Sequence, residues 1–434
     1  MSPPLIGLLG FAITLLLILF RVPVAIAMGV VGAIGFGVLN GFFGVAFVMG
    51  SAPFEAVFPY SLSVVPLFVM MGVFAAHTGL SQSLYRAVHA FVGHLRGGLA
   101  IATIGACAGF GAICGSSLAT AATMCRVALP EMRRHGYDDR LASASIAAGG
   151  TLGVLIPPSI LLVIYGLLTE TSIGRLFLAG IVPGLLATGL YMAAVAVQTA
   201  RRPELGPAGA RSPWAARVRA VRDVWGTALL FLLVIGGIYR GWFSPTEAAA
   251  VGALGAFLIA LLLGRMSKGV LLAAAHETMQ TTGMIFLILL GASVFNYFIE
   301  TAGVPQLLIG WVENAGLPRY AVLLIVMAFY VVLGCFLDSL SMILLTVPFV
   351  FPLIAALQFD PVWFGILLVT VAELGLITPP VGMNLFVIQG TAGDLRLETI
   401  VRGIGPFLIA DLIRLLVLIA LPQLVLWLPA RMAG

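Results

Sequence analysis

The stretch Gly375-Leu376-Ile377-Thr378-Pro379-Pro380 lies inside an apolar run that is long enough to cross a bilayer. A similar stretch, Gly153-Val154-Leu155-Ile156-Pro157-Pro158, lies in a run of the same kind in the first half of the chain. Two consecutive prolines remove two backbone donors and disfavour helical backbone at the residue before them, so each run must be a broken helix. Because irregular backbone at bilayer depth is tolerated only where it is buried in protein or lines a cavity, we expect the two breaks to form the functional centre.

The composition is that of a polytopic membrane protein. Of the 434 residues, 61% are hydrophobic and 9% are charged, whereas soluble domains have about 25% charged residues. The first apolar run, residues 5–20, has no basic segment before it and no small-residue cleavage site after it, so we expect a retained helix. The four cysteines lie in apolar segments without metal-ligand spacing, which predicts reduced, packed thiols.

The two stretches belong to a longer internal repeat. The shift in numbering that carries Gly153 onto Gly375, called the repeat shift below, also carries Ser117 onto Ser339, Pro130 onto Pro352 and Asp138 onto Asp360. Each half has five expected crossings, an odd number, so the halves insert in opposite orientations and form inverted-topology repeats. In chain order, the parts are residues 1–198 with a re-entrant hairpin at 99–129 and a broken helix at 142–167, a linker at 199–224, and residues 225–434 with a hairpin at 320–353 and a broken helix at 361–390.

Two segments are amphipathic rather than uniformly apolar. Residues 81–96 and 266–277 each carry basic and histidine side chains beside an expected crossing. We interpret both as interfacial arm helices that lie along the membrane and brace a moving part against a fixed frame.

The basic residues predict the orientation. Six arginines lie in the linker, and placing that linker in the cytoplasm puts 17 of the 22 Lys and Arg residues on the cytoplasmic side and 4 on the other. This topology predicts that both termini are periplasmic, that the first hairpin enters from the cytoplasm, and that the second enters from the outside. The net charge of +5 therefore reflects membrane orientation and not a nucleic-acid partner.

Polar residues gather at the tip of the first hairpin, where Ser116, Ser117 and Thr120 interrupt an apolar segment. A half-helix N-terminus presents free N–H groups to an anion, and unwound carbonyls can coordinate Na⁺, so this architecture suits an anionic substrate and its coupling cation. The alternative is that small residues at the tip only allow close helix packing.

The second half repeats this pattern with acidic residues added. Asp338 and Ser339 lie at the second tip, while Glu373, Thr378 and Asn384 flank the second break. A carboxylate at bilayer depth is costly unless it serves a cation, a proton or a partner, so we expect functional roles, with helix capping by Asp338 as the alternative. Asp411 and Arg414, three residues apart in the last long crossing, are expected to pair with each other.

Enzymatic signatures are missing from the sequence. It contains no GxxxxGK[ST] phosphate loop, no HExxH and no GxSxG, and its five histidines lie in loops and interfacial segments. We therefore expect a protein that is not an enzyme, with an intramembrane Asp or Ser hydrolase as a remote alternative.

Three motifs resemble a known family. They are Gly115-Ser116-Ser117-x-Ala119-Thr120, the Leu-Gly-x-x-Ile-Pro-Pro-Ser run at 152–159, and the Glu-x-Gly-x-x-Thr-Pro-Pro-x-Gly-x-Asn-Leu-Phe-Val run at 373–387. Together they are similar to the large membrane subunit of tripartite ATP-independent periplasmic (TRAP) transporters, and the resemblance covers essentially the whole chain. It implies an all-α polytopic fold of the elevator type, in which two hairpins and two broken helices slide against a scaffold.

The resemblance also implies a function and partners. These are Na⁺-coupled uptake of an organic acid anion, such as a dicarboxylate or sialic acid, across the bacterial inner membrane, with substrate delivered by a periplasmic binding protein. A small four-helix membrane subunit is expected as a separate polypeptide, and membrane lipid as the surrounding partner. The alternatives are a stand-alone sodium and organic-anion symporter, or a passive channel or scaffold.

Carried over by position, the resemblance assigns two sodium sites and a substrate site. One departure from the family pattern is Leu118, where tips of the family often have proline. The first sodium site is assigned to Ser116, Thr120, Gly153, Ile156 and Pro158, the second to Gly334, Gly375, Thr378 and Val381, and the substrate site to Ser117, Asp338, Ser339, Glu373 and Asn384.

Overall fold

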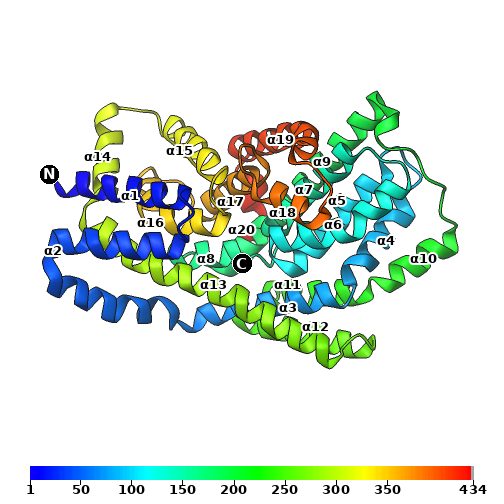
Figure 1. The fold of residues 1–434 in the computed structure, drawn as a ribbon, viewed down its shortest axis with the longest axis horizontal. Coiled ribbons are helices and arrows are strands. Elements are labelled where there is room, and N and C mark those ends of the chain that lie inside the picture. Colours follow the sequence, from blue (N-terminus) through cyan, green and yellow to red (C-terminus); the bar gives the residue numbers. More distant parts are fainter. Residues whose placement is uncertain (432–434) are drawn as a thin grey trace.

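The computed structural model describes residues 1–431, and this part of the chain consists of helices and turns without a strand. Figure 1 shows a long outer layer of helices along one side and a second group of helices packed above it. The all-α membrane fold expected from the sequence is confirmed.

The first half runs from α1 to α9. Two short elements, a 3-10 turn at Tyr60–Ser63 and another at Pro203–Leu205, join longer helices. The helices are α1 (Pro3–Leu19), α2 (Val24–Val57), α3 (Val64–His77), α4 (Leu80–Val92), α5 (Gly98–Cys114), α6 (Ser117–Arg134), α7 (Asp139–Leu155), α8 (Ile160–Leu168) and α9 (Ile173–Arg201).

The second half follows a linker that contains one further helix, α10 (Trp214–Asp223). Its last helix, α20, has no counterpart in the first half. The helices are α11 (Trp225–Tyr239), α12 (Pro245–Leu262), α13 (Lys268–Thr301), α14 (Val304–Ala315), α15 (Arg319–Gly334), α16 (Ser339–Ala356), α17 (Pro361–Ile377), α18 (Met383–Ala392), α19 (Leu397–Ala420) and α20 (Gln423–Ala430).

The repeat is visible in the helix bounds and in the packing. The repeat shift carries the bounds of α6 and α7 onto those of α16 and α17. The packing is exchanged between halves, since α6 lies against α18 while α16 lies against α8. Likewise α7 packs on α19 and α17 packs on α9. Each hairpin therefore packs on the broken helix of its own half and also on the helix that follows the break in the other half, so the two halves form one core.

An outer layer of helices lies along one side of this core (Figure 1). Helix α2 runs beside α13 over much of its length, and α3 packs on α12 (Figure 1). Helix α2 bends at Gly41, whose φ of 77° lies in the left-handed region that favours glycine. The helices α7 and α17, by contrast, are buried over nearly all of their residues.

The expectation of a separate arm helix at 266–277 is wrong. Ser267 caps α13 by accepting a hydrogen bond from the N–H of Val270, and the helix then continues without interruption to Thr301. Polar residues near 277 do not end a helix, because they neither remove a backbone donor nor require special backbone angles. Residues 81–96, expected as the other arm, overlap α4, which begins at Leu80 and ends at Val92, and the repeat shift carries α4 onto the region of α14.

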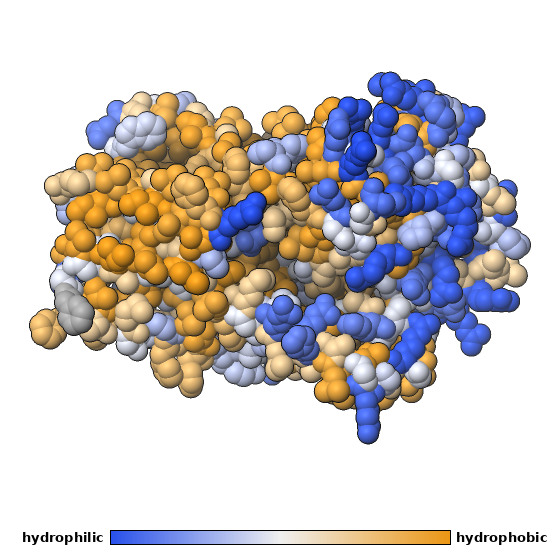
Figure 2. Space-filling model, viewed as in Figure 1, coloured by the Kyte–Doolittle hydropathy of each residue, from blue (hydrophilic) through white to orange (hydrophobic). Residues whose placement is uncertain are grey.

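The apolar surface agrees with a membrane protein. Among the described helices, seven are long and apolar enough to cross a bilayer, or nine when two bent pairs are included. One bent pair is α7 with α8, whose axes differ by 42° across the first Pro-Pro break. Figure 2 shows hydrophilic side chains gathered at the right-hand end, where α4, α10 and the end of α9 lie in Figure 1, and hydrophobic side chains over the left.

Candidate functional site

The first hairpin turns at a glycine and a serine. Helix α5 ends at Cys114, Gly115 adopts a φ of +64°, and Ser116 begins the next helix by accepting a hydrogen bond from the N–H of Ala119 at 3.4 Å. The positive φ explains why glycine occupies position 115, since other L-residues rarely adopt it. The tip therefore presents the N-terminus of α6 to the cavity described below.

The first break closes onto this tip. A Cβ atom built on Gly153 would lie 2.7 Å from Oγ1 of Thr120 and 3.0 Å from the carbonyl oxygen of Ser116, so both oxygens crowd the backbone of the broken helix. The Thr120 hydroxyl is buried and has no hydrogen-bond partner among the described residues. The carbonyl oxygen of Pro158 approaches Gly115 in the same region. Gly153 lies in the last turn of α7 and Ile156 directly follows α7, in the region where helix carbonyls have no intrahelical donor.

The second break closes onto the second hairpin in a related way. A Cβ atom on Gly375 would lie 2.5 Å from Cα of Gly334, so only glycine permits the backbones of α15 and α17 to touch here. The hydroxyl of Thr378 donates to the carbonyl oxygen of Leu374 at 2.6 Å, which leaves its own oxygen free to accept. Val381 lies just after the Pro-Pro pair and is half-buried.

The two places where a hairpin meets the broken helix of its half, called junctions below, differ in which of the two elements supplies a hydroxyl group. The repeat shift places Met342 at the position of Thr120 and Ile156 at that of Thr378. Each junction therefore has one threonine, contributed by the hairpin in the first half and by the broken helix in the second.

A cavity of about 690 Å³ lies between the tips. Ser116, Ser117, Asp338 and Ser339 all line it, so both hairpins contribute their tips. Helices α6 and α16 begin at Ser117 and Ser339, and both N-termini therefore direct the positive ends of their dipoles toward this cavity. An anion is the ligand that such an arrangement favours.

Asp338 caps α16 and also lies at the cavity. One carboxylate oxygen accepts a hydrogen bond from the N–H of Ser341 at 3.0 Å and caps α16, while the other accepts from the Ser341 hydroxyl. Asp338 also lines the cavity. The hydroxyl of Ser339 is buried without a partner in the described part of the chain.

Asn384 joins the two halves rather than lining the cavity. Its amide nitrogen lies 2.8 Å from the Ser117 hydroxyl oxygen and 3.1 Å from the carbonyl oxygen of Ala147. The side chain is fully buried. Asn384 therefore positions the first tip from α18, a helix of the other half.

Glu373 is placed differently from the expectation of a substrate ligand. Its carboxylate lies 2.9 Å from the guanidinium of Arg414, and neither side chain is exposed. Arg414 also pairs with Asp411 at 3.0 Å, as expected, and Asp411 accepts a hydrogen bond from the hydroxyl of Tyr191 at 2.6 Å. Because Glu373 faces this ion-pair network and is not among the residues that line the cavity, its assignment to the substrate site is not supported by its position.

The cavity wall contains residues that the sequence did not single out as ligands. His77 of α3 and Glu277 of α13 line it, and their side chains meet at 3.0 Å. Arg126 of α6 lines the same cavity from the hairpin. One signal was available, since the repeat shift carries Glu55 onto Glu277, but the histidine has no counterpart in the repeat.

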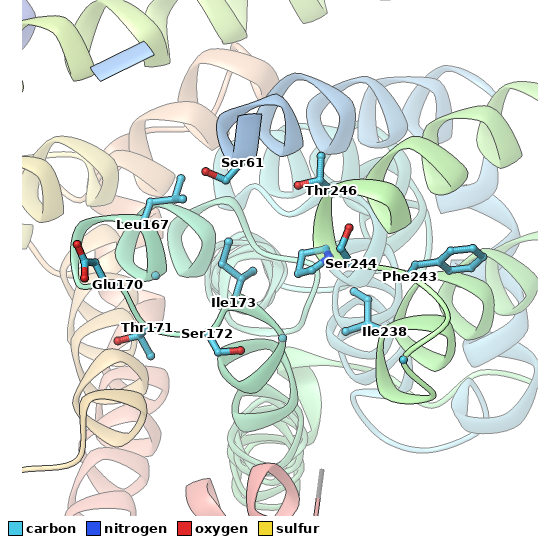
Figure 3. Close-up of a pocket in the computed structure, with 14 residues that line it drawn as sticks. Ser61, Leu167, Glu170, Thr171, Ser172, Ile173, Ile238, Phe243, Ser244 and Thr246 are labelled. Atoms are coloured by element: carbon cyan, nitrogen blue, oxygen red, sulfur yellow. The ribbon is translucent and has the colours of Figure 1, made fainter. Parts of the chain in front are cut away.

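A second cavity of about 670 Å³ lies elsewhere (Figure 3). Its walls come from the α8–α9 turn, the α11–α12 turn and the 3-10 turn that contains Ser61, with Glu170, Ser172 and Ser244 among its polar residues. None of the predicted site residues lines it. We therefore take the cavity between the hairpin tips as the candidate site.

Comparisons with known proteins agree with this architecture. A family model described as "Tripartite ATP-independent periplasmic transporter, DctM component" matches residues 11–424. The chain is 39% identical over 379 residues to the C4-dicarboxylate TRAP transporter large permease protein DctM of Pseudomonas aeruginosa, covering 87% of this chain and 88% of that protein. It is 33% identical over 377 residues to the sialic acid TRAP transporter large permease protein SiaM of Vibrio cholerae, covering 86% of this chain and 87% of that protein.

The fold is also found in a solved structure. The YdaH transporter of Alcanivorax borkumensis superposes with a TM-score of 0.66 at 16% identity, covering 95% of this chain and 98% of that one. The motifs at the hairpin tips and breaks, the match along nearly the whole sequence and the shared fold lead to one assignment: this chain belongs to the DctM family, the large permease component of tripartite ATP-independent periplasmic transporters.

Proposed function

We propose that this permease moves an organic acid anion into the cell together with Na⁺, using an elevator motion of its hairpins and broken helices. The observation that carries the proposal is the pair of junctions, in each of which a hairpin contacts the broken helix of its own half. In the first, the buried Thr120 hydroxyl lacks a partner in the described chain while the Ser116 carbonyl oxygen lies beside it. Hydroxyl and carbonyl oxygens are the hard ligands that a small cation prefers.

The second junction supplies similar ligands. Thr378 keeps an accepting oxygen, and the close backbone contact of Gly334 with Gly375 brings carbonyl groups of both helices together. A cation at either junction would bind a hairpin and a broken helix at once. Binding there would fix the shape of the tips and so couple Na⁺ to substrate affinity.

The substrate class follows from the charge of the cavity. Two helix N-termini and Arg126 face it, and these favour a carboxylate, while the acidic side chains in the wall are engaged, Glu277 with His77 and Asp338 as the cap of α16. The relatives named for C4-dicarboxylate and sialic acid support a carboxylate substrate. The sequence of the permease leaves the particular acid open, because a periplasmic binding protein would select it.

The cavity extends from the tips to Arg126, His77 and Glu277. In the topology favoured by the basic residues, these three lie toward the cytoplasm, and the arrangement corresponds to an inward-facing state. A small membrane subunit and a binding protein complete the proposed transporter, and both termini of this chain lie in the periplasm.

The test is uptake into proteoliposomes that contain the permease, its small partner and a binding protein loaded with labelled organic acid. Uptake should require an inward Na⁺ gradient. In Thr120→Ala the Na⁺ concentration for half-maximal uptake should rise about ten- to a hundredfold, since a ligand to a charged group is worth about 1.5–3 kcal/mol. Thr120→Ser retains the hydroxyl and should stay near the wild type.

Other outcomes separate the alternatives. Uptake without the binding protein would favour a stand-alone symporter of the same fold. Flux that does not saturate and ignores Na⁺ would contradict the proposal and favour a channel.

A further inference from the structure

Helix α10 carries an apolar stripe that no part of the described chain covers. Trp214, Val218 and Val221 are spaced four and three residues apart, as required for one face of a helix. Their exposed fractions are 70%, 54% and 56%, and α10 has no buried residue. Apolar residues gathered on one exposed helix face mark a candidate contact surface.

The apolar stripe continues from α10 onto α11, and the apolar composition of α11 indicates that lipid surrounds it. Helix α11 follows α10 after a bend of 45°, and the pair together is long and apolar enough to span a bilayer. The exposed residues Trp225, Leu229 and Leu232 extend the same spacing along α11. Because lipid surrounds the exposed face of a spanning helix, lipid is the occupant that fits the continuous stripe on α10.

The flanking charges specify the kind of lipid. Arg219 and Arg222 are exposed on α10, with Arg222 beside the stripe and Arg219 farther round the helix, toward its polar face. The whole linker contains six arginines between 201 and 222. Anionic phospholipid headgroups attract arginines at the interface.

One edge of the stripe is attached to the protein through Arg217. The guanidinium of Arg217 donates from Nε to the carbonyl oxygen of Ala90 at 3.1 Å and lies 5.6 Å from the ring centre of Phe91. Both partners belong to α4, which packs on both helices of the first hairpin. Helix α10 is thus held at the edge of the molecule beside α4 (Figure 1).

We propose that α10 is an interfacial helix that binds the bilayer surface, seating Trp214, Val218 and Val221 among acyl chains and Arg219 and Arg222 against anionic phospholipid headgroups. This goes beyond transport by the hairpins and does not depend on Na⁺ coupling. It gives the linker between the repeats a lipid-binding surface that is attached to α4.

The experiment measures the depth of single nitroxide labels in the full-length permease in nanodiscs. Val218→Cys places the label on the stripe, and Asp223→Cys places it on the opposite exposed face of the same helix. The four native cysteines are buried, which disfavours their labelling. With phosphatidylglycerol present, the label at 218 should be accessible to oxygen and shielded from a water-soluble nickel chelate, and the label at 223 should show the reverse.

Two matched charge variants test the headgroup contact. In Arg219→Gln with Arg222→Gln, the mole fraction of phosphatidylglycerol needed for half-maximal shielding at 218 should rise at least about fivefold, the loss expected for one or more arginines at an anionic surface. Arg240→Gln, at the far end of α11, should leave it unchanged. Melting temperatures near that of the wild type would show that each variant is folded.

Three results would overturn the proposal. Access of the nickel chelate to position 218 in every lipid would place the stripe in water. Shielding from both oxygen and nickel would mean that protein, either a partner or a second copy, covers it. Shielding that is the same in phosphatidylcholine alone would contradict the role of the arginines.

Discussion

The guanidinium of Arg414 lies 2.9 Å from the carboxylate of Glu373, and both side chains are fully buried. Arg414 belongs to the last long helix of the second half, and Glu373 lies shortly before Gly375, the glycine that touches the second hairpin. The pair therefore fixes the second broken helix beside its break. Arg414 also faces Asp411, so one guanidinium contacts two carboxyl groups.

Removing the guanidinium should destabilise the permease strongly. In Arg414→Met the carboxylates of Glu373 and Asp411 lose their buried partner, and breaking such a pair costs about 3–5 kcal/mol. The melting temperature in detergent or nanodiscs should fall by many degrees. The control is Arg402→Met, which removes an exposed partner of Glu398 and should cost less than about 1 kcal/mol. Similar losses in both variants would contradict a structural role for the buried pair.

The glycine contact at the second break should tolerate no side chain. In Gly375→Ala the new Cβ would lie 2.5 Å from Gly334, so the hairpin must move away from the broken helix. Transport should be lost or reduced more than tenfold, with a lower melting temperature. Gly390→Ala in α18, which has no atom within 4 Å of the new Cβ, should be neutral or slightly stabilising. Normal uptake by Gly375→Ala would show that close contact at this break is not required.

The charge of Asp338 can be separated from its role as a helix cap. Asp338→Asn retains an oxygen that can accept from the N–H of Ser341, so the melting temperature should change little. If the carboxylate acts in the cavity, uptake should fall at least tenfold. Asp360→Asn is the matched control, because Asp360 caps α17 by accepting from the N–H of Val362 at 2.8 Å and does not line the cavity. Equal activity in the two variants would leave Asp338 with capping alone.

Stability should fall in mild acid because of His89 on α4. Burial lowers the pKa of His89 below its ordinary value of 6.5, His135 lowers the pKa further, and Glu131 opposes both. The folded protein therefore favours neutral His89, and the unfolded chain binds more protons as the pH falls through 6.5, so the free energy of unfolding decreases. Melting temperatures measured from pH 8 to pH 5 should decline less in His89→Gln. Exposed His276→Gln should follow the wild type, and a parallel decline in His89→Gln would exclude His89 as a source of the pH dependence.

Much of the site could be predicted from local sequence because the determining physics is local. A Pro-Pro pair interrupts a helix wherever it stands, and both breaks were found directly after Leu155 and Ile377. Gly115 and Ser116 form a turn and a helix cap through their own backbone and side chain. Inverted repeats followed from counting crossings, which needs only length and apolarity.

Tertiary structure alone decided what these segments face. Glu373 pairs with Arg414 of α19, His77 with Glu277 of α13, and Ser117 with Asn384 of α18. The continuity of α13 also depended on how the helices pack, since amphipathic patterns alone do not mark where a helix ends. The sequence by itself determined where the chain breaks, because backbone donors and φ angles are properties of single residues. Which side chains meet at those breaks was decided only by the tertiary structure, because burial and charge pairing are properties of the whole packed core.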